Sequence, residues 1–167
     1  MASTQENLQE AFAGESQANR KYLAFAKKAD EDGFPQVAKL LRAAAEAETV
    51  HAHAHLRVLG GIQDTLANLK VASEGEAHEF KEMYPTFLAE AEEEGNKPAV
   101  FSIRNALAVE EIHYGLYNEA IEAVKVGDDL TETSVWVCPV CGNTVKGGPP
   151  DKCPICGVPG ERFTEIL

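Results

Sequence analysis

The sequence lacks a long apolar run and is poor in basic residues. It has 15 Lys and Arg against 27 Asp and Glu, which gives a formal net charge of -12. A nucleic-acid partner needs a basic surface that this composition does not supply. No apolar stretch approaches the roughly 18 residues of a membrane-spanning helix. Residues 1–10 have neither the basic patch nor the apolar core of a signal peptide. We therefore expect a cytoplasmic protein with no nucleic-acid and no membrane partner.

Cysteine is absent before residue 138 and then occurs in two Cys-Pro-x-Cys-Gly units. The pairs are Cys138 with Cys141 and Cys153 with Cys156, and residues 142–152 separate them. This spacing is typical of a four-thiolate metal site in a reducing compartment, and a disulfide framework is less consistent with it. Considered alone, the two units favour a structural zinc ribbon. Iron in the same cage would add a one-electron redox couple.

The 167 residues, of which 44% are hydrophobic, suit one medium domain with a small appendage. Before residue 127 the apolar residues recur at steps of three and four, which predicts four helices. Residues typical of helix ends bound them: Ser3 and Glu6 in a capping box, Pro35, Gly60, Gly61, Asp64, Gly95, Pro98 and Gly127. Pro85 lies inside the third helix, about 64–94, where we expect a kink.

The composition changes to Cys, Pro and Gly after the polar residues 127–134. We therefore predict three parts: a helical bundle over residues 1–126, a linker over 127–134 and a metal-binding domain over 135–167. The connection between the second and third helices is long enough to cross over the bundle, as in ferritin-like folds.

Five acids and two histidines occupy positions in the apolar stripes of the four helices. They are Glu15, Glu48, His51, Glu76, Glu79, Glu110 and His113. Residues three apart share one helix face, so each Glu-x-x-His pair can aim two ligands at one point. Five uncompensated carboxylates could not share a core, whereas two bound cations would neutralise them. The set matches that of di-iron bundles with one extra glutamate, so we predict a dinuclear site.

Spacing alone does not decide the roles of several residues near this site. Glu82 forms a second Glu-x-x-Glu pair with Glu79, so either could be the third helix's extra ligand. Tyr22 and Tyr84 are core aromatic residues or hydrogen-bond donors to the carboxylates. His53 is expected on the surface, and we assign no role to His55.

The chain resembles the rubrerythrin family, in which a ferritin-like di-iron bundle is fused to a rubredoxin-like domain. The resemblance rests on AGESQANRKY, EAETVHA, EGEAHEFKEMYP, the later EEIH and both CPxCG units in that order. It implies a mainly α fold, a ferritin-like four-helix bundle with a small C-terminal rubredoxin-like iron-ribbon domain. It also implies Glu79 rather than Glu82 as a ligand, and an exchange of His51 with Glu79 as one iron changes oxidation state.

The resemblance further implies the function and the partners. Two non-haem irons would reduce hydrogen peroxide to water, with Tyr22 and Tyr84 near the site, and a four-cysteine iron would relay electrons. The distant donor would be a reduced pyridine nucleotide, acting through a separate reductase or rubredoxin, and the protein would be a homodimer. Two alternatives stay open: a ferroxidase or iron-handling bundle, and an electron carrier or structural zinc protein.

Overall fold

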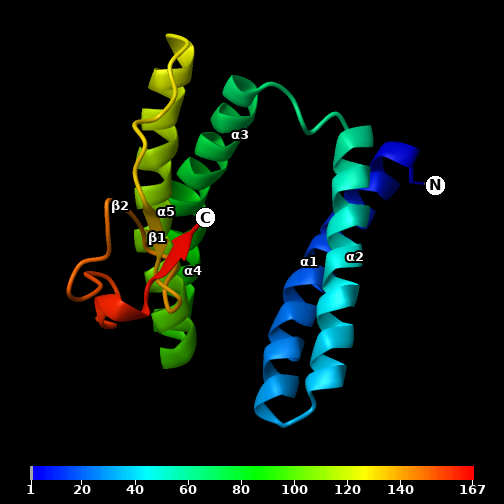
Figure 1. Ribbon diagram of the computed structural model, residues 1–167. Helices are drawn as coiled ribbons and strands as arrows, with labels where there is room; N and C mark the ends of the chain where they lie inside the picture. Colours follow the sequence, from blue (N-terminus) through cyan, green and yellow to red (C-terminus); the bar gives the residue numbers. More distant parts are fainter. Residues whose placement is uncertain (1) are drawn as a thin grey trace. The chain divides into compact units, whose positions relative to one another are not determined.

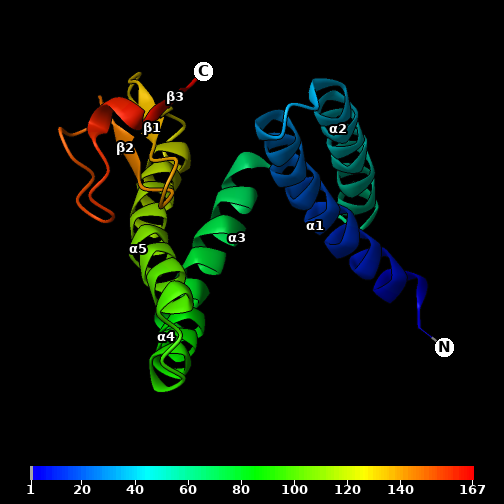
Figure 2. The same cartoon turned by 90° about the horizontal axis from the view of Figure 1, so that it is seen from below.

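The computed structural model describes residues 2–167, whose contacts divide into two units, residues 2–63 and 64–167. The first unit is a hairpin of α1 (Thr4–Glu31) and α2 (Pro35–Val58), which lie side by side in Figures 1 and 2. The predicted capping box is confirmed, because the Ser3 hydroxyl accepts from the Glu6 amide and the Glu6 carboxylate accepts from the Ser3 amide. Gly33 makes the turn between the helices with a φ of 83°, a conformation that favours glycine.

The two helices of this hairpin pack through small side chains. Ala26 on α1 and Ala38, Ala45 and Ala52 on α2 are all buried. The small alanine side chain lets the two helix backbones approach closely.

The second unit begins with α3 (Thr65–His78), the π-helix η1 (Glu79–Met83) and α4 (Tyr84–Glu93). These three elements pack along α5 (Lys97–Lys125). The kink expected at Pro85 stays a prediction, and the structure has a π-helix in the turn before this residue. Pro85 has no amide hydrogen to donate to the carbonyl of Lys81, so the regular i to i+4 ladder cannot continue there. The Tyr84 amide instead donates to the carbonyl of Glu79, five residues back.

The unit ends in a three-stranded antiparallel sheet of order β2-β1-β3. Its strands are β1 (Val135–Val137), β2 (Thr144–Lys146) and β3 (Thr164–Ile166), with the short 3₁₀ helix η2 (Gly160–Arg162) before β3. Cys138, Cys153 and Phe163 form its small core. In Figures 1 and 2 this sheet lies against α5. The predicted domain bounds stay a prediction, although β1 does begin at Val135.

Within residues 2–167, no helix combines the length and the apolar character that crossing a membrane requires.

Candidate metal centres

The first unit carries a three-residue cluster of possible metal ligands. Glu15 comes from α1, while Glu48 and His51 come from α2, and their ligand atoms all lie within 4.8 Å of one another. His51 Nδ1 lies 3.0 Å from Glu48 Oε2 and 3.9 Å from Glu15 Oε1. Adjacent ligands of a metal ion with bonds of 2.0–2.1 Å are roughly 2.9 Å apart in octahedral geometry. The His51–Glu48 pair therefore has the spacing that such an ion requires.

The two carboxylates of this cluster shift each other's pKa in opposite directions. A hydrogen bond to Glu48, followed by burial, raises the pKa of Glu15, whereas hydrogen bonds from Glu15 and His51 lower the pKa of Glu48. One carboxyl group thus stays protonated more readily so that the other can be charged. A bound cation would offset the negative charge of both carboxylates.

Asn19 sets the register of the two helices that hold the cluster. Its buried side-chain amide donates to the Ala45 carbonyl at 2.7 Å and to the Thr49 hydroxyl at 2.8 Å. Asn19 lies one turn after Glu15, and Thr49 follows Glu48 directly. The crosslink therefore fixes Glu15 opposite Glu48. Helical periodicity in the sequence did not reveal this role of Asn19.

The second unit carries a matching cluster. Glu76 comes from α3, while Glu110 and His113 come from α5, again with ligand atoms within 4.8 Å. His113 Nδ1 lies 2.9 Å from Glu110 Oε2 and 3.7 Å from Glu76 Oε1. Burial, and then the negative charge of Glu110, raise the pKa of Glu76 to about 7. Two facing carboxylates in a half-buried position favour a cation between them.

The π-helix places Glu79 and Glu82 in different surroundings. Glu79 is half-buried, and burial followed by the charge of Glu110 raises its pKa. Glu82 is 74% exposed and lies 3.3 Å from His78. Glu79 is therefore the residue of this pair that shares the electrostatic field of the cluster. The sequence did not reveal the π-helix, although Pro85 gave a signal of irregularity; such single π-turns are frequent at functional sites.

Three tyrosines differ in their relation to the clusters. Burial, and then the charge of Glu79, raise the pKa of Tyr84, so its hydroxyl stays protonated. Burial and then Glu76 raise the pKa of Tyr117 as well, a residue to which sequence reasoning gave no role. Tyr22 packs on Phe25 with ring centroids 6.5 Å apart. Within the first unit, Tyr22 therefore has an aromatic neighbour.

Two histidines of α2 lie outside the cluster. His55 is half-buried, and its charge acts to lower the pKa of Glu15. His53 is exposed, as expected, and lines a hollow of about 230 Å³ with Phe12 and Asn19.

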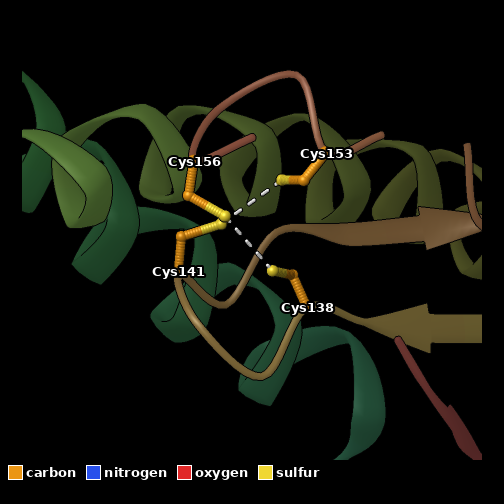
Figure 3. Close-up of side chains that lie close together, drawn as sticks. All are labelled: Cys138, Cys141, Cys153 and Cys156. Atoms are coloured by element: carbon orange, nitrogen blue, oxygen red, sulfur yellow. Dashed lines mark hydrogen bonds between the residues drawn. The ribbon is translucent and has the colours of Figure 1, made fainter. Parts of the chain in front are cut away.

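The four cysteines form a cage between two loops, and Figure 3 shows their sulfurs pointing toward one another. Cys138 Sγ lies 3.6 Å from Cys156 Sγ, and Cys141 Sγ lies 3.6 Å from Cys153 Sγ. A disulfide needs about 2.05 Å. Four sulfurs around a metal with bonds of 2.3 Å are roughly 3.8 Å apart in a tetrahedron. The spacing therefore fits a tetrahedral metal site, and the prediction of one shared cage matches this geometry.

The two loops have the same backbone design. In the first, the Gly142 amide donates to the Cys138 carbonyl at 2.9 Å, and in the second the Gly157 amide donates to the Cys153 carbonyl at 3.0 Å. Both glycines have positive φ, 85° and 79°, which explains the final Gly of each CPxCG unit. The tight turns aim further amides at the sulfurs. Burial raises the pKa of Cys153, but hydrogen bonds from the amides of Cys156 and Ile155 and from the neighbouring thiols together lower it to about 6.

The cage is seated on α5 of the same unit. The position that a Cβ atom would take at Gly142 is 3.7 Å from Val109 Cγ1, directly before Glu110. Thr144 Oγ1 lies 2.9 Å from His113 Nε2. Lys146 Nζ lies 2.6 Å from Glu119 Oε1. The cysteine domain and the second cluster are therefore joined by the hydrogen bond between Thr144 and His113.

Comparisons with known proteins agree with this geometry. A profile of the rubrerythrin family matches residues 6–121, and a profile of the rubredoxin-like domain of rubrerythrin matches residues 136–164. The chain belongs to the rubrerythrin family. Rubrerythrin-2 of Clostridium acetobutylicum is 34% identical to it, over 97% of this chain and 96% of that protein. Nigerythrin of Nitratidesulfovibrio vulgaris is 37% identical, over 98% of this chain and 87% of that protein.

A solved structure of nigerythrin in its fully reduced, all-ferrous state has a TM-score of 0.59 to this chain. It is 34% identical and covers 99% of this chain and 88% of the other. These rubrerythrin comparisons confirm the predicted fold class, mainly α with a rubredoxin-like C-terminal domain. They also place the chain among oxidoreductases with an iron-handling or oxidative-stress role.

The donor atoms of the three clusters fit iron. Carboxylate oxygen and imidazole nitrogen suit Fe in a redox-active di-iron site, and four thiolates suit either Fe or Zn. The Asn143 side-chain amide, buried within the cysteine domain, lies 3.8 Å from Cys153 Sγ. Such hydrogen bonds to sulfur tune the potential of a thiolate-bound metal.

Proposed function

We propose that this chain is a non-haem di-iron peroxidase that reduces hydrogen peroxide to water. The observation that carries the proposal is a repeated ligand set, one Glu and one Glu-x-x-His pair on each helical unit, beside a four-thiolate cage. With Glu79, the two sets supply the proposed ligands of two irons: Glu15, Glu48, His51, Glu76, Glu79, Glu110 and His113. Two ferrous ions bound there would supply together the two electrons that, with two protons, convert one peroxide into two waters.

The chain's own residues would bind the ions and move protons. The carboxylates offset the charge of the ions, and the Tyr84 hydroxyl, which stays protonated, is suited to donate a hydrogen bond or a proton near Glu79. We assign Tyr22 to the same environment by analogy with the family. His51 is 55% exposed, which leaves it room to leave the site when Glu79 takes its place.

The cysteine cage would hold a third iron and return electrons one at a time. The contacts of Gly142 and Thr144 with α5 support this assignment, because they bring the cage against the helix that carries Glu110 and His113. We further propose a reductase or rubredoxin that draws on reduced pyridine nucleotide as the donor. A homodimer in the cytoplasm, where thiolates stay reduced, completes the proposal.

A stoichiometric reaction tests the function. The iron-loaded protein is fully reduced without oxygen and mixed with one equivalent of peroxide, and the peroxide that remains is measured. We expect rapid loss of peroxide, followed by the red colour of a ferric four-thiolate centre. Slow or absent loss of peroxide would refute the proposal. Catalytic oxidation of excess Fe(II) by oxygen, with little peroxide turnover, would instead indicate a ferroxidase.

A matched variant separates the two kinds of site. Cys138→Ser should remove the red colour and block steady turnover with an external donor. It should still allow one rapid reaction of the reduced carboxylate site with peroxide. If the variant turned over as fast as the unmodified chain, the cage would not be the relay.

A further inference from the structure

Thr144 of β2 lies between the cysteine cage and the second carboxylate cluster. Its Oγ1 is 3.1 Å from the Gly142 carbonyl oxygen and 2.9 Å from His113 Nε2. A carbonyl oxygen can only accept, so the single hydroxyl proton is donated to Gly142. The hydroxyl oxygen then accepts a hydrogen bond from His113 Nε2–H. This leaves Nδ1 as the atom that faces Glu110 Oε2 at 2.9 Å and Glu76 Oε1 at 3.7 Å.

We propose that Thr144 is a positioning residue through which the folded cysteine domain prepares His113 to bind metal. The hydroxyl selects the imidazole tautomer that has its lone pair on Nδ1, and it fixes the orientation of the ring. A partner on the second ring nitrogen is a common way to orient a metal-binding histidine. The inference rests on the proposed metal ligation by the cluster of Glu76, Glu110 and His113.

The position of Thr144 depends on the cage itself. Thr144 pairs with Val137 in the sheet, and Val137 directly precedes Cys138. The Cys138 amide donates to the Asn143 carbonyl at 2.9 Å, next to Thr144. Loss of the metal from the cage would release these turns and, with them, the hydroxyl that holds His113. Metal binding at the two sites is therefore linked.

The packing of β2 against α5 fixes the position of the Thr144–His113 hydrogen bond. Thr144 and Lys146 project from the same face of β2, because side chains alternate along a strand. Lys146 pairs with Glu119, and Gly142 packs near Val109, so contacts flank the His113–Thr144 hydrogen bond on both sides. Thr144 is half-buried there. The hydrogen bond to the Gly142 carbonyl would by itself stabilise the turn, so the second contact with His113 points to a further role of the hydroxyl.

Zinc binding tests the inference without relying on activity. The full-length chain, with zinc in its cysteine cage, is titrated with Zn²⁺ by calorimetry, and the imidazole nitrogens of His113 are followed by ¹⁵N NMR. Thr144→Val keeps the shape but removes the hydroxyl, Thr144→Ser restores it, and Thr164→Val changes the same residue type on exposed β3. We expect Thr144→Val to weaken binding at the cluster by about 10–100-fold and to shift the His113 Nε2 resonance. Thr144→Ser should recover most of the affinity, and Thr164→Val should match the unmodified chain.

Two further outcomes distinguish a failure of the role of Thr144 from a failure of the proposed metal site. If Glu76→Gln lowers zinc affinity at the cluster while Thr144→Val does not, the positioning role is wrong but the metal site stands. If Glu76→Gln and His113→Ala leave zinc binding unchanged, the cluster is not a metal site, and the proposed function fails together with this inference. Equal losses in Thr144→Val and Thr144→Ser would also refute the role of the hydroxyl.

Discussion

The α1–α2 cluster and the α3–α5 cluster each consist of two glutamates and one histidine, but they hold their histidines differently. His113 is 26% exposed and is contacted at both ring nitrogens, by Glu110 and by Thr144. His51 is 55% exposed, and the contacts that the structure records for it within residues 2–167 involve Nδ1. One histidine is thus fixed before metal binds, while the other keeps freedom to move. The same Glu-x-x-His spacing therefore supports two different behaviours.

The carboxylates of the two clusters differ in the same sense. Desolvation is the first cause of the raised pKa of Glu76, whereas for Glu15 it is the hydrogen bond with Glu48. The α3–α5 cluster thus bears a larger cost of burying charge in the absence of metal. In the first cluster the hydrogen bond between the two carboxyl groups raises the pKa of Glu15 and lowers that of Glu48. We expect metal to matter more to the stability of the second unit.

Removal of metal should give the largest effect. Chelation of all metal should lower the free energy of unfolding by about 4 kcal/mol if the free metal had been near 1,000 times its dissociation constant. Calorimetric melting of apo and loaded protein measures the change. Hydrogen exchange should show the greater loss of protection in α3 and α5. Equal melting of both forms would contradict the claim that metal offsets the carboxylate charge.

Replacing each histidine in turn should show how much each cluster's histidine contributes to metal affinity. His113→Ala should weaken metal binding by about 100-fold, roughly 2.7 kcal/mol, because a fixed ligand is lost. His51→Ala should cost about tenfold or less, roughly 1.4 kcal/mol, because the free ring must be ordered on binding. Calorimetric titration with Zn²⁺ gives both values, and His53→Ala is the control on the same helix. A larger loss from His51→Ala would reverse the comparison.

Much of the site followed from helical periodicity, because it places each acid on a stripe otherwise filled by apolar residues. Glu15, Glu48 and His51 do meet, and so do Glu76, Glu110 and His113. Such local pairing is a property of each helix and its neighbour, so spacing predicts it. The capping box at Ser3 and the paired cysteine turns followed from equally local rules.

The features that sequence did not reveal depend on tertiary contact or on a change of helical pitch. Thr144 meets His113 across 31 positions, and no local pattern links a strand residue to a helix residue. The π-helix adds one residue to a turn, so the i to i+3 rule no longer fixes which side chain faces inward after Glu79. Spacing had left Glu79 and Glu82 open because both belong to a Glu-x-x-Glu pair, and the π-helix supplies the difference in their surroundings.

The pH dependence of the metal-free protein should expose the buried charge of the second cluster. Glu76 has a pKa of about 7 when folded against 4.5 as a reference, so the folded state binds more protons between these values. Stability should therefore fall as pH rises from about 4.5 to about 7, by on the order of 2 kcal/mol after reduction for solvent screening. Urea unfolding of apoprotein across this range measures the fall. Glu76→Gln should flatten the dependence of the unfolding free energy on pH. Glu74→Gln, on an exposed site of the same helix, should leave it unchanged. An unchanged slope in Glu76→Gln would argue against a buried charge at Glu76.

The smallest expected effect concerns the choice that spacing left open on the π-helix. Glu79→Gln should weaken metal binding by about tenfold, roughly 1.4 kcal/mol, because a half-buried carboxylate near Glu110 loses its charge. Glu82→Gln should change it little, because that side chain is 74% exposed and its partner is His78. Both variants keep size and shape, so each is the other's control in the same zinc titration. Under the proposed function, Glu79→Gln should also slow the reaction of the reduced protein with peroxide, because the proposed iron ligand loses its charge. The reverse order of effects would mean that metal binding rewinds the π-helix and brings Glu82 inward.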